Sequence, residues 1–309
     1  MKLSASICTY NREKYLPIIF ESIKRQTMST DLFEVILVNN NSPGNTKGLC
    51  EKFKLDNPTI HFLYFEEFEQ GLSFARNRSI KESNGSYITF LDDDAFLAPD
   101  YFEIIVDEFE KNKEIAALGG QILLHYETIK PAWENKYLNS LLGFYSPSDS
   151  PFIYESNYAK KDYPRGSNMS FRKAVFERIG NFNVELGRIG GNLLGGEEKD
   201  LFYRIYGESD YIVKYLPSAI VYHCVPIERT TKAFIVRQAL GTGRSEQIRA
   251  KNDKTYLNAL LRELVKWMGS IVLCFQYIFK NQWQKGKMIL LFRYWVSRGL
   301  LFEKLDKII

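Results

Sequence analysis

Residues 87–102 read YITFLDDDAFLAPDYF, with three consecutive aspartates in the middle. The aspartates follow a run of strand-forming residues and precede a helix that we expect to begin after Pro99. Asp92 and Asp94 lie two residues apart, so an extended chain places both carboxylates on one side, with Asp93 pointing the other way. Such a pair suits a hard divalent cation, which prefers oxygen ligands. A solvated turn is the alternative, and the position after a fourth predicted parallel strand favours the metal site.

Around this stretch, apolar strand-forming runs alternate with helical patterns through the first 125 residues. The alternation is typical of successive βαβ units on a mostly parallel sheet. We predict strands at residues 2–8, 34–38, 60–65, 86–91 and 116–124. We predict helices at residues 13–27, 45–55, 71–83 and after Pro99. Ligands of such sheets bind outside the carboxyl ends of the strands, where the TYNR, NNNS and DDD motifs all fall.

Two polar loops at predicted strand ends are candidates for nucleotide binding. Thr9, Tyr10 and Asn11 offer hydrogen bonds and an aromatic face for a nucleobase. Arg12 suits a phosphate or a helix cap. Asn40 belongs to an Asn-rich loop that suits a base or ribose edge. An ordinary turn is the alternative for each loop, because Asn is common in turns for local reasons.

Further candidates lie at helix starts and at a late strand end. Arg76 opens a predicted helix, where a cation opposes the helix dipole but favours an anionic ligand. Glu197 and Glu198 follow Gly-Gly at another helix start, where carboxylates stabilise any protein, and the flexible glycines favour a chemical role. His223 ends a strand; a lone histidine is usually structural, but a place beside an acidic site favours a metal ligand.

The second half of the chain is predicted to mix helices and strands. Residues 126–165 read as a helix plus a long loop, which is typical of a substrate lid. A short strand and a helix ending at Gly180 follow, then a helix ending at Gly207. The stretches YIVKYLP and AIVYHCV read as two strands. From residue 231 onward the pattern is helical, with breaks near Asn252 and Asn281.

Charge is divided unevenly along the 309 residues, of which 45% are hydrophobic and 25% charged, as in ordinary globular proteins. Residues 1–228 hold 25 Lys and Arg against 32 Asp and Glu, a net charge of −7, whereas residues 229–309 hold 16 against 5, a net charge of +11. The basic tail is rich in apolar residues, so it reads as amphipathic helices for an anionic surface and not as a nucleic-acid arm.

The tail contains an uncharged stretch, residues 267–279, that is thirteen residues long. Spanning a bilayer takes about twenty residues, so we expect peripheral docking on anionic lipid, packing against the rest of the chain, or a homodimer contact. No secretory signal follows Met1, and the four cysteines are scattered. We therefore expect a cytoplasmic protein, at the inner face of the cell membrane if the tail docks there.

Taken together, the motifs resemble the family-2 glycosyltransferases, inverting enzymes with the GT-A fold. The stretches SICTYNR, EVILVNNNS, GLSFARN, ITFLDDD, GSNMSFRKAVFERIGNFN and GGEEKDLFYRI occur in the order found in that family, over roughly residues 1–240. The resemblance implies an α/β, Rossmann-like and mostly parallel sheet flanked by helices. It implies a catalytic domain at 1–230, with a nucleotide-binding half at 1–125 and an acceptor-binding half at 126–230, and a basic helical appendage at 231–309.

The resemblance assigns donor binding to the first loops and to the DDD motif. Thr9, Tyr10, Asn11, Arg12 and Asn40 fall in the nucleotide-binding loops. Relatives carry Asp at the positions that read the base, whereas residues 39–41 are Asn here. Because an amide both donates and accepts hydrogen bonds, uracil, thymine and guanine all remain possible bases of the donor.

The remaining donor residues follow in the next motifs. Arg76 and Asn77 would face the base and phosphate of the donor. Asp94 would be the direct Mn²⁺ or Mg²⁺ ligand, Asp92 would lie nearer the ribose, and Asp93 belongs to the same nucleotide-sugar-binding motif.

The resemblance also assigns the catalytic and acceptor residues. Glu198 stands where the family places its general base, one methylene longer than the common Asp, and Glu197 is the alternative. His223 matches a histidine that completes the metal site in some relatives. Gly166 and Asn168 would line the acceptor side.

The implied reaction transfers a sugar from a nucleotide-diphosphate sugar to a hydroxyl of a glycan or lipid-linked saccharide, in bacterial polysaccharide or glycoconjugate synthesis. The metal would neutralise the leaving diphosphate while Glu198 accepts the hydroxyl proton. One alternative is a metal-dependent nucleotidyltransferase, although its Gly-rich phosphate loop is missing from the sequence. Another is an inactive sugar-nucleotide-binding or membrane scaffold.

Overall fold

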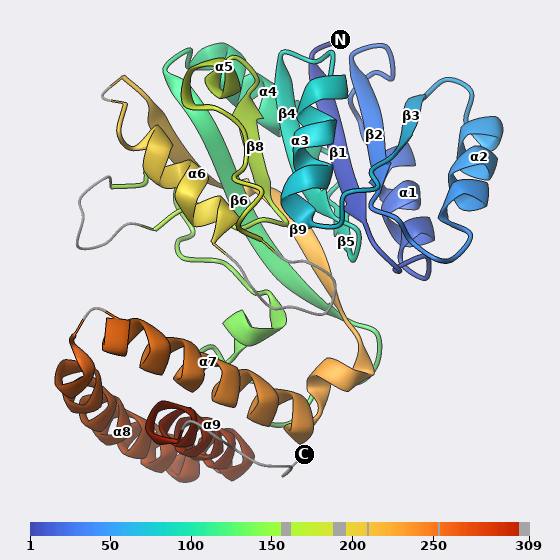
Figure 1. The fold of residues 1–309 in the computed structure, drawn as a ribbon. Coiled ribbons are helices and arrows are strands. Elements are labelled where there is room, and N and C mark those ends of the chain that lie inside the picture. The colour runs from blue at the N-terminus through green and yellow to red at the C-terminus, as the bar shows by residue number, and fades with distance from the viewer. Residues whose placement is uncertain (156–161, 188–195, 209, 253, 303–309) are drawn as a thin grey trace. The chain divides into compact units, whose positions relative to one another are not determined.

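The computed structural model describes residues 1–155, 162–187, 196–208, 210–252 and 254–302 (Figure 1). By its contacts the chain divides into two compact units. The sheet unit comprises residues 1–123 and 145–223, and the helical unit comprises residues 124–144 and 224–309. Each unit is considered by itself below.

One mixed β-sheet forms the centre of the sheet unit, with the strand order β3-β2-β1-β4-β8-β6-β9-β5 and β7 beside β9. Its first four strands are parallel, because β1 pairs in parallel with β2 and β4, and β2 with β3. Strand β8 is antiparallel to both β4 and β6. The strands are β1 (Leu3–Thr9), β2 (Phe33–Asn39), β3 (His61–Glu66), β4 (Tyr87–Asp92), β5 (Ala95–Leu97), β6 (Ile115–Tyr126), β7 (Phe152–Ile153), β8 (Met169–Arg172) and β9 (Ile212–Val225).

Helices cover both faces of this sheet. Leu3, Ala5 and Ile7 of β1 pack in one core with α1 and α4, whereas Ile36 and Val38 of β2 pack against α3 on the other face. Strand β8 packs on α5 and α6 in a third cluster. The helices are α1 (Leu16–Lys24), α2 (Thr46–Asp56), α3 (Leu72–Glu82), α4 (Tyr101–Lys111), α5 (Val175–Ile179) and α6 (Glu197–Ile205). The predicted α/β sheet flanked by helices is confirmed, and its later strands add an antiparallel half.

Two predicted elements differ from the structure. The stretches predicted as two strands are the single strand β9, which runs through Pro217. A proline fits an extended strand where its missing N–H is not needed. The helix predicted within 126–165 is only the 3-10 turn η1 (Asn139–Leu142). Just before it, the Asn135 side chain accepts hydrogen bonds from the N–H groups of Tyr137 and Leu138, at 3.0 and 3.2 Å, which favours a turn over a helix.

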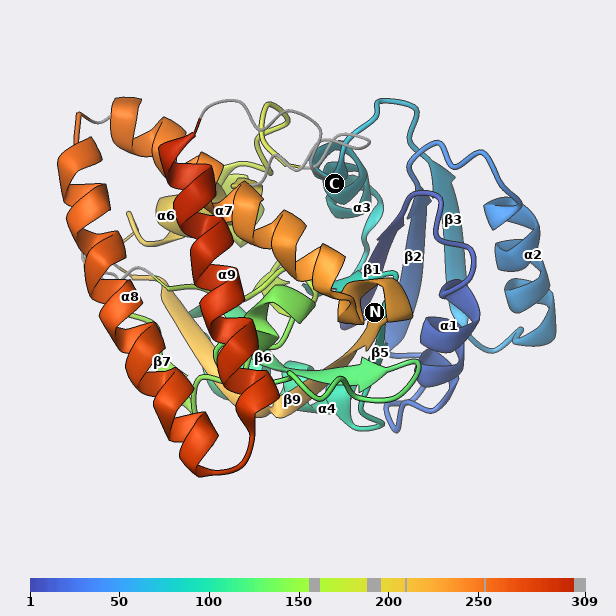
Figure 2. The ribbon, with the colours of Figure 1, turned by 90° about the horizontal axis from the view of Figure 1, so that it is seen from below.

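The helical unit contains the turn η2 (Ile227–Thr230) and three long helices, α7 (Lys232–Asn252), α8 (Tyr256–Phe279) and α9 (Trp283–Leu301). Helix α9 packs against both α7 and α8 (Figure 2). Gly243 and Gly299 allow α7 and α9 to approach closely, because a Cβ on Gly243 would lie 2.1 Å from the carbonyl oxygen of Val296.

A buried polar contact holds α8 to α9. Arg293 and Glu263 form an ion pair at 3.2 Å, and Ser297 donates a 2.9 Å hydrogen bond to the same carboxylate. The predicted helical breaks near Asn252 and Asn281 are confirmed. No helix within the described ranges is both long and apolar enough to cross a membrane.

Candidate active site

The three aspartates lie at the carboxyl end of β4. Asp92 is the last residue of the strand and stands opposite Cys8 of β1. Asp93 and Asp94 form the turn into β5 and are only 8% and 4% exposed. Strand β5 pairs antiparallel with β9, which places Ala95 opposite His223. This register brings His223 from a distant part of the sequence to the aspartates.

Asp92, Asp94 and His223 together form a cluster that could hold a metal ion. Their ligand atoms lie within 4.8 Å of one another, and His223 Nε2 is 3.4 Å from Asp94 Oδ1. Two carboxylates and an imidazole are a donor set that divalent cations accept. The residues present therefore fit the divalent cation that the sequence predicts.

Arg12 also contacts this cluster. Its Nη1 lies 2.5 Å from Asp94 Oδ2, and its side chain is 33% exposed. Burial works against the charge of Arg12, but the carboxylates of Asp94 and Asp93 outweigh burial and raise the pKa of the guanidinium. The sequence predicted Arg12 as a phosphate ligand or helix cap and gave no sign of this pairing.

Asp93 points to the first loop. Thr9 Oγ1 donates a 2.7 Å hydrogen bond to Asp93 Oδ2. Burial, together with the adjacent charge of Asp94, raises the pKa of Asp93 to about 7, and Arg12 and the Thr9 hydroxyl offset part of the effect. Asp93 is thus held by a hydroxyl from β1.

A second charged cluster surrounds Arg76, which is 2% exposed in the first half of α3. Its Nη1 lies 3.2 Å from Glu197, and its Nη2 lies 3.2 Å from Glu198. The guanidinium also lies over the rings of Phe182 and Phe90, with 5.2 and 6.0 Å to their centroids. Arg76 therefore joins α3 to the N-terminal turn of α6.

Of the two glutamates, Glu198 is the more accessible. Its side chain is 22% exposed, against 7% for Glu197. Burial raises the pKa of Glu198, the charge of Arg76 lowers it, and Glu197 and Asp92 raise it again. The field of Asp92 reaches Arg76 as well, so the two clusters belong to one electrostatic site.

Gly166 lies directly against this second cluster. A Cβ built on it would come within 2.0 Å of Glu198 Oε1 and 2.8 Å of Arg76 Nη2. No side chain fits there while Glu198 keeps its bond to Arg76. Gly196, which precedes α6, has a φ of +118°, a conformation that favours glycine.

The whole site carries an excess of negative charge. Its five carboxylates meet two guanidinium groups, and the members are Asp92, Asp93, Asp94, Glu197, Glu198, Arg12 and Arg76. Gathering so many buried carboxylates is unfavourable unless cations compensate them. The excess favours a cationic ligand.

Comparison with known proteins identifies the family. The model of the family "Glycosyl transferase family 2" matches residues 4–180, more than half of the chain. The chain belongs to glycosyl transferase family 2. It is therefore a glycosyltransferase, and its fold is the expected GT-A fold.

Relatives of this glycosyltransferase are found in archaea and bacteria. It is 28% identical over 273 residues to a glucosyl-dolichyl phosphate glucuronosyltransferase of Haloferax volcanii, covering 86% of this chain and 83% of the relative. It is 35% identical over 104 residues to the minor teichoic acid biosynthesis protein GgaB of Bacillus subtilis, covering 34% of this chain but 11% of that longer relative.

Among solved structures, a mannosyltransferase of Pyrobaculum calidifontis in complex with GDP-Man and Mn²⁺ superposes with a TM-score of 0.60 at 16% identity. The superposition covers 98% of this chain and 88% of the other. The likeness concerns the fold.

The first loop of the glycosyltransferase is open to solvent. Tyr10 is 41% exposed, and Asn11 has a φ of +54°, which asparagine tolerates. The Asn11 N–H donates a 3.0 Å hydrogen bond to Ser42 Oγ, so the loops after β1 and β2 are joined. Their predicted contacts with a nucleotide stay predictions.

Two predicted donor residues use their amides within the protein. Asn40 is 4% exposed; it donates to the carbonyl oxygens of Glu67 and Glu69 and accepts from the Gly71 N–H. Asn77 exchanges two 2.9 Å hydrogen bonds with the backbone of Phe182. The geometry gives both residues a positioning role, and Asn77 explains how Phe182 is held beside Arg76.

Asn168, predicted on the acceptor side, is fully buried. It accepts a 2.8 Å hydrogen bond from the Tyr101 hydroxyl and donates to the carbonyl oxygens of Gln121 and Ala219. Its amide ties α4, β6 and β9 together. Of the residues predicted to line the acceptor side, Gly166 is the one whose backbone adjoins Glu198.

Sequence reasoning missed Phe182 and Gly187 as parts of the site. Gly187 has a φ of +102°, and a Cβ there would lie 3.4 Å from the Glu197 carboxyl carbon. Phe182 belongs to the quoted GNFN motif, which carried no role. The two Gly residues predicted to give α6 a flexible entry are Gly195, which lies outside the described residues, and Gly196.

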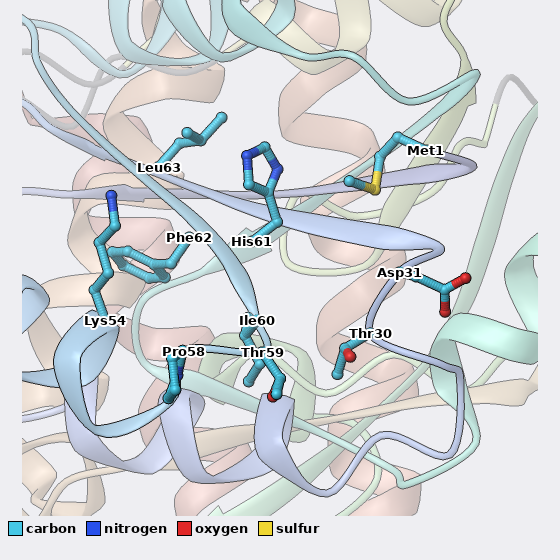
Figure 3. Close-up of a pocket in the computed structure, with 10 residues that line it drawn as sticks. All are labelled: Met1, Thr30, Asp31, Lys54, Pro58, Thr59, Ile60, His61, Phe62 and Leu63. Atoms are coloured by element: carbon cyan, nitrogen blue, oxygen red, sulfur yellow. The ribbon is translucent and has the colours of Figure 1, made fainter.

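A surface pocket of about 470 Å³ lies elsewhere, at the amino ends of β2 and β3. Figure 3 shows Met1 and Asp31 on one side of it and Lys54 on the other. No residue predicted for the active site lines it. Because family chemistry gathers at the carboxyl ends of the strands, we base the function on the charged site and not on this pocket.

Proposed function

We propose that this glycosyltransferase transfers a sugar from a nucleotide-diphosphate sugar to an acceptor hydroxyl with inversion, in a reaction that needs a divalent cation and uses Glu198 as general base. The observations that carry the proposal are the 3.2 Å bond between Arg76 and Glu198 and, in the same sheet unit, the Asp92, Asp94 and His223 set that fits a cation. One displacement, with the base on one side and the leaving group on the other, inverts the anomeric carbon.

For the donor, Asp92, Asp94 and His223 would hold the cation. A bound divalent cation neutralises the charge that develops on the leaving diphosphate. Arg12 balances Asp94 in this structure, and its guanidinium is suited to phosphate oxygens. The Pyrobaculum calidifontis neighbour, which holds GDP-Man and Mn²⁺, supports this assignment at the level of the fold.

For the acceptor, Glu198 takes the proton of the attacking hydroxyl. Its raised pKa makes the carboxylate a stronger base than an exposed glutamate, and its 22% exposure leaves it open to a substrate. The bond to Arg76 fixes one carboxylate oxygen, and the backbone of Gly166 packs directly against the same oxygen. Glu197 is less accessible and is the second choice.

The acceptor that we favour is a lipid-linked saccharide. The Haloferax volcanii relative, aligned over most of both chains, is named as a glucuronosyltransferase of glucosyl-dolichyl phosphate. Both asparagine amides that the sequence offered to the base of the donor bond within the protein, Asn39 to the Tyr64 hydroxyl and Asn40 to the Glu67 carbonyl oxygen.

A donor screen tests this function. UDP-, GDP- and dTDP-sugars are incubated with Mn²⁺ or Mg²⁺ and a lipid-linked acceptor, and transfer is followed by mass spectrometry. We expect one donor class to turn over, with no turnover after chelation and an inverted anomeric product. Retention of configuration, or metal-independent transfer, would contradict the mechanism. In a parallel incubation with a nucleoside triphosphate and a sugar 1-phosphate, formation of the nucleotide sugar with release of pyrophosphate would instead show a nucleotidyltransferase. Donor binding with no turnover would show a scaffold.

A further inference from the structure

Helix α8 presents a row of apolar side chains to solvent. Ten of its large apolar residues are between 43% and 87% exposed. They are Leu257, Leu261, Leu264, Val265, Met268, Ile271, Val272, Phe275, Ile278 and Phe279. We call this row the α8 face.

The spacing of the row places all ten side chains on one side of the helix. Successive members are separated mainly by three and four residues, the repeat that keeps side chains on the same helical face. The buried residues of α8 lie on another side, where Glu263 pairs with Arg293 of α9 and Cys274 adjoins Gly286 of α9. The α8 face therefore points away from α9.

An apolar row of this length is unusual on a protein that meets only water. A 24-residue helix is about 36 Å long, and exposed apolar patches above a few hundred Å² mark interaction sites. The α8 face contains no charged residue. The acid of α8, Glu263, is 6% exposed and paired, so it does not oppose an anionic partner.

Basic side chains flank the row. Lys266 and Lys280 are exposed beside the α8 face, as is Arg262, which also forms a 3.3 Å ion pair with Glu246 of α7, in a C-terminal region whose net charge is +11. Two copies of so basic a region would repel each other if their α8 faces met. An anionic lipid surface instead attracts exposed Lys and Arg side chains while it buries the apolar side chains.

We infer that the α8 face is a membrane-docking surface, on which the helix lies in the plane of an anionic bilayer. The sequence had pointed to the uncharged stretch at residues 267–279. In the structure the exposed row begins ten residues earlier, at Leu257. The inference concerns binding alone and does not depend on the proposed sugar transfer.

Vesicle flotation of the full chain tests the inference. Phosphatidylcholine vesicles are compared with vesicles that also contain phosphatidylglycerol. We expect binding to the anionic vesicles and a drop of at least about tenfold in the bound fraction for the triple variant Leu264→Ser, Met268→Ser, Phe275→Ser. The variant Arg262→Gln, Lys266→Gln, Lys280→Gln should lose the preference for anionic vesicles.

The matched control is Leu55→Ser, which removes an apolar side chain that is 80% exposed in α2 and should leave flotation unchanged. Circular dichroism and the melting temperature check that each variant is folded. Absence of wild-type flotation, or equal flotation of the α8-face variant, would overturn the inference. So would an α8-face variant that converts a dimer to a monomer in sedimentation, or that melts at a clearly lower temperature, because the face would then cover a second copy or the chain itself.

Discussion

The sheet unit and the helical unit depart from ordinary burial in opposite ways. The sheet unit buries charge, since Asp93, Asp94, Arg76 and Glu197 are each at most 8% exposed. The helical unit exposes apolar surface along the α8 face. Buried charge and exposed apolar rows both reduce the stability of a chain in water, and these are the two places where we propose a bound cation and a membrane surface.

The comparison is sharper because the helical unit also buries an ion pair. Glu263 and Arg293 balance each other, and Ser297 adds a hydrogen bond, so this pair needs no further partner. In the sheet unit, five carboxylates meet two guanidinium groups. The same chain thus contains a balanced buried pair that serves structure and an unbalanced cluster that favours a ligand.

The largest effect is expected from Glu198→Gln. Gln keeps the shape of the side chain but cannot accept the hydroxyl proton, so transfer should fall about a thousandfold while donor affinity stays nearly unchanged. Steady-state kinetics and calorimetric titration of the donor measure the two quantities. Glu197→Gln is the matched control, and we expect a smaller loss of transfer.

The pH dependence of the wild type belongs to the same test. Because the pKa of Glu198 is raised, the base is lost as pH falls through a value above the ordinary 4.5, and kcat/KM should decline there. The Gln variant should lack this decline in its residual activity. Full transfer activity of Glu198→Gln would contradict Glu198 as the general base. If activity were lost only in Glu197→Gln, Glu197 would be the general base.

Substitution of two phenylalanines compares how much the interior of the sheet unit and the α8 face contribute to the free energy of unfolding. Phe171 is fully buried in β8, whereas Phe275 is 56% exposed. We expect Phe171→Ala to lower the free energy of unfolding by about 3 kcal/mol or more and Phe275→Ala to change it by under about 0.5 kcal/mol. Urea unfolding measures both. A large loss for Phe275→Ala would show that the α8 face is covered within the protein.

The third largest effect is expected on Mn²⁺ affinity, from a substitution in the metal cluster. Asp94→Asn removes one charge from the Asp92, Asp94 and His223 set, and Mn²⁺ affinity should fall about a hundredfold, with metal-dependent donor binding falling alongside. Calorimetry of Mn²⁺ binding gives a readout apart from activity. Asp107→Asn, an exposed aspartate of α4, is the control. Unchanged Mn²⁺ affinity in Asp94→Asn would show that the cation does not bind at this cluster.

The smallest effect is on stability and follows from the pKa of Asp93, which is raised to about 7. Between the unfolded pKa near 4 and the folded value, the folded state binds a proton that the unfolded state does not, so stability falls as pH rises through this window. In chelator, wild type should lose about 2 kcal/mol between pH 5 and pH 8, and Asp93→Asn should lose clearly less. Parallel pH dependence of both proteins in urea unfolding would contradict the assignment.

Local signals in the sequence predicted much of the fold. Runs of apolar, strand-forming residues placed five predicted strands within a few residues of β1, β2, β3, β4 and β6, and among these β1, β2 and β4 are almost wholly buried. The strand β9 was split in the prediction because Pro217 resembles a break. The helix predicted within residues 126–165 was wrong because side-chain hydrogen bonds, such as those of Asn135, stabilise turns there, and hydrophobic periodicity does not reveal such bonds.

The site was predictable where its side chains lie at strand ends, as Asp92, Asp94 and His223 do, and not where charged side chains pair across the sheet. Strand position and spacing pointed to Asp92 and Asp94. The pairing of Arg12 with Asp94, and of Arg76 with both glutamates, depends on side-chain directions across the sheet, which no local pattern encodes. Asn40 and Asn168 hydrogen-bond within the protein, and no local sequence pattern distinguishes such amides from amides that bind a ligand.

Because strand β9 belongs to both units, removing the helical unit by truncation would disturb the candidate active site. His223 is the last residue of the sheet unit, and Cys224 in the same strand is the first of this stretch of the helical unit. A truncation at that boundary would leave the imidazole on a chain end, where strands fray. Lost activity in such a shortened protein would not report on the helices. Point substitutions on the intact chain are therefore the cleaner experiment.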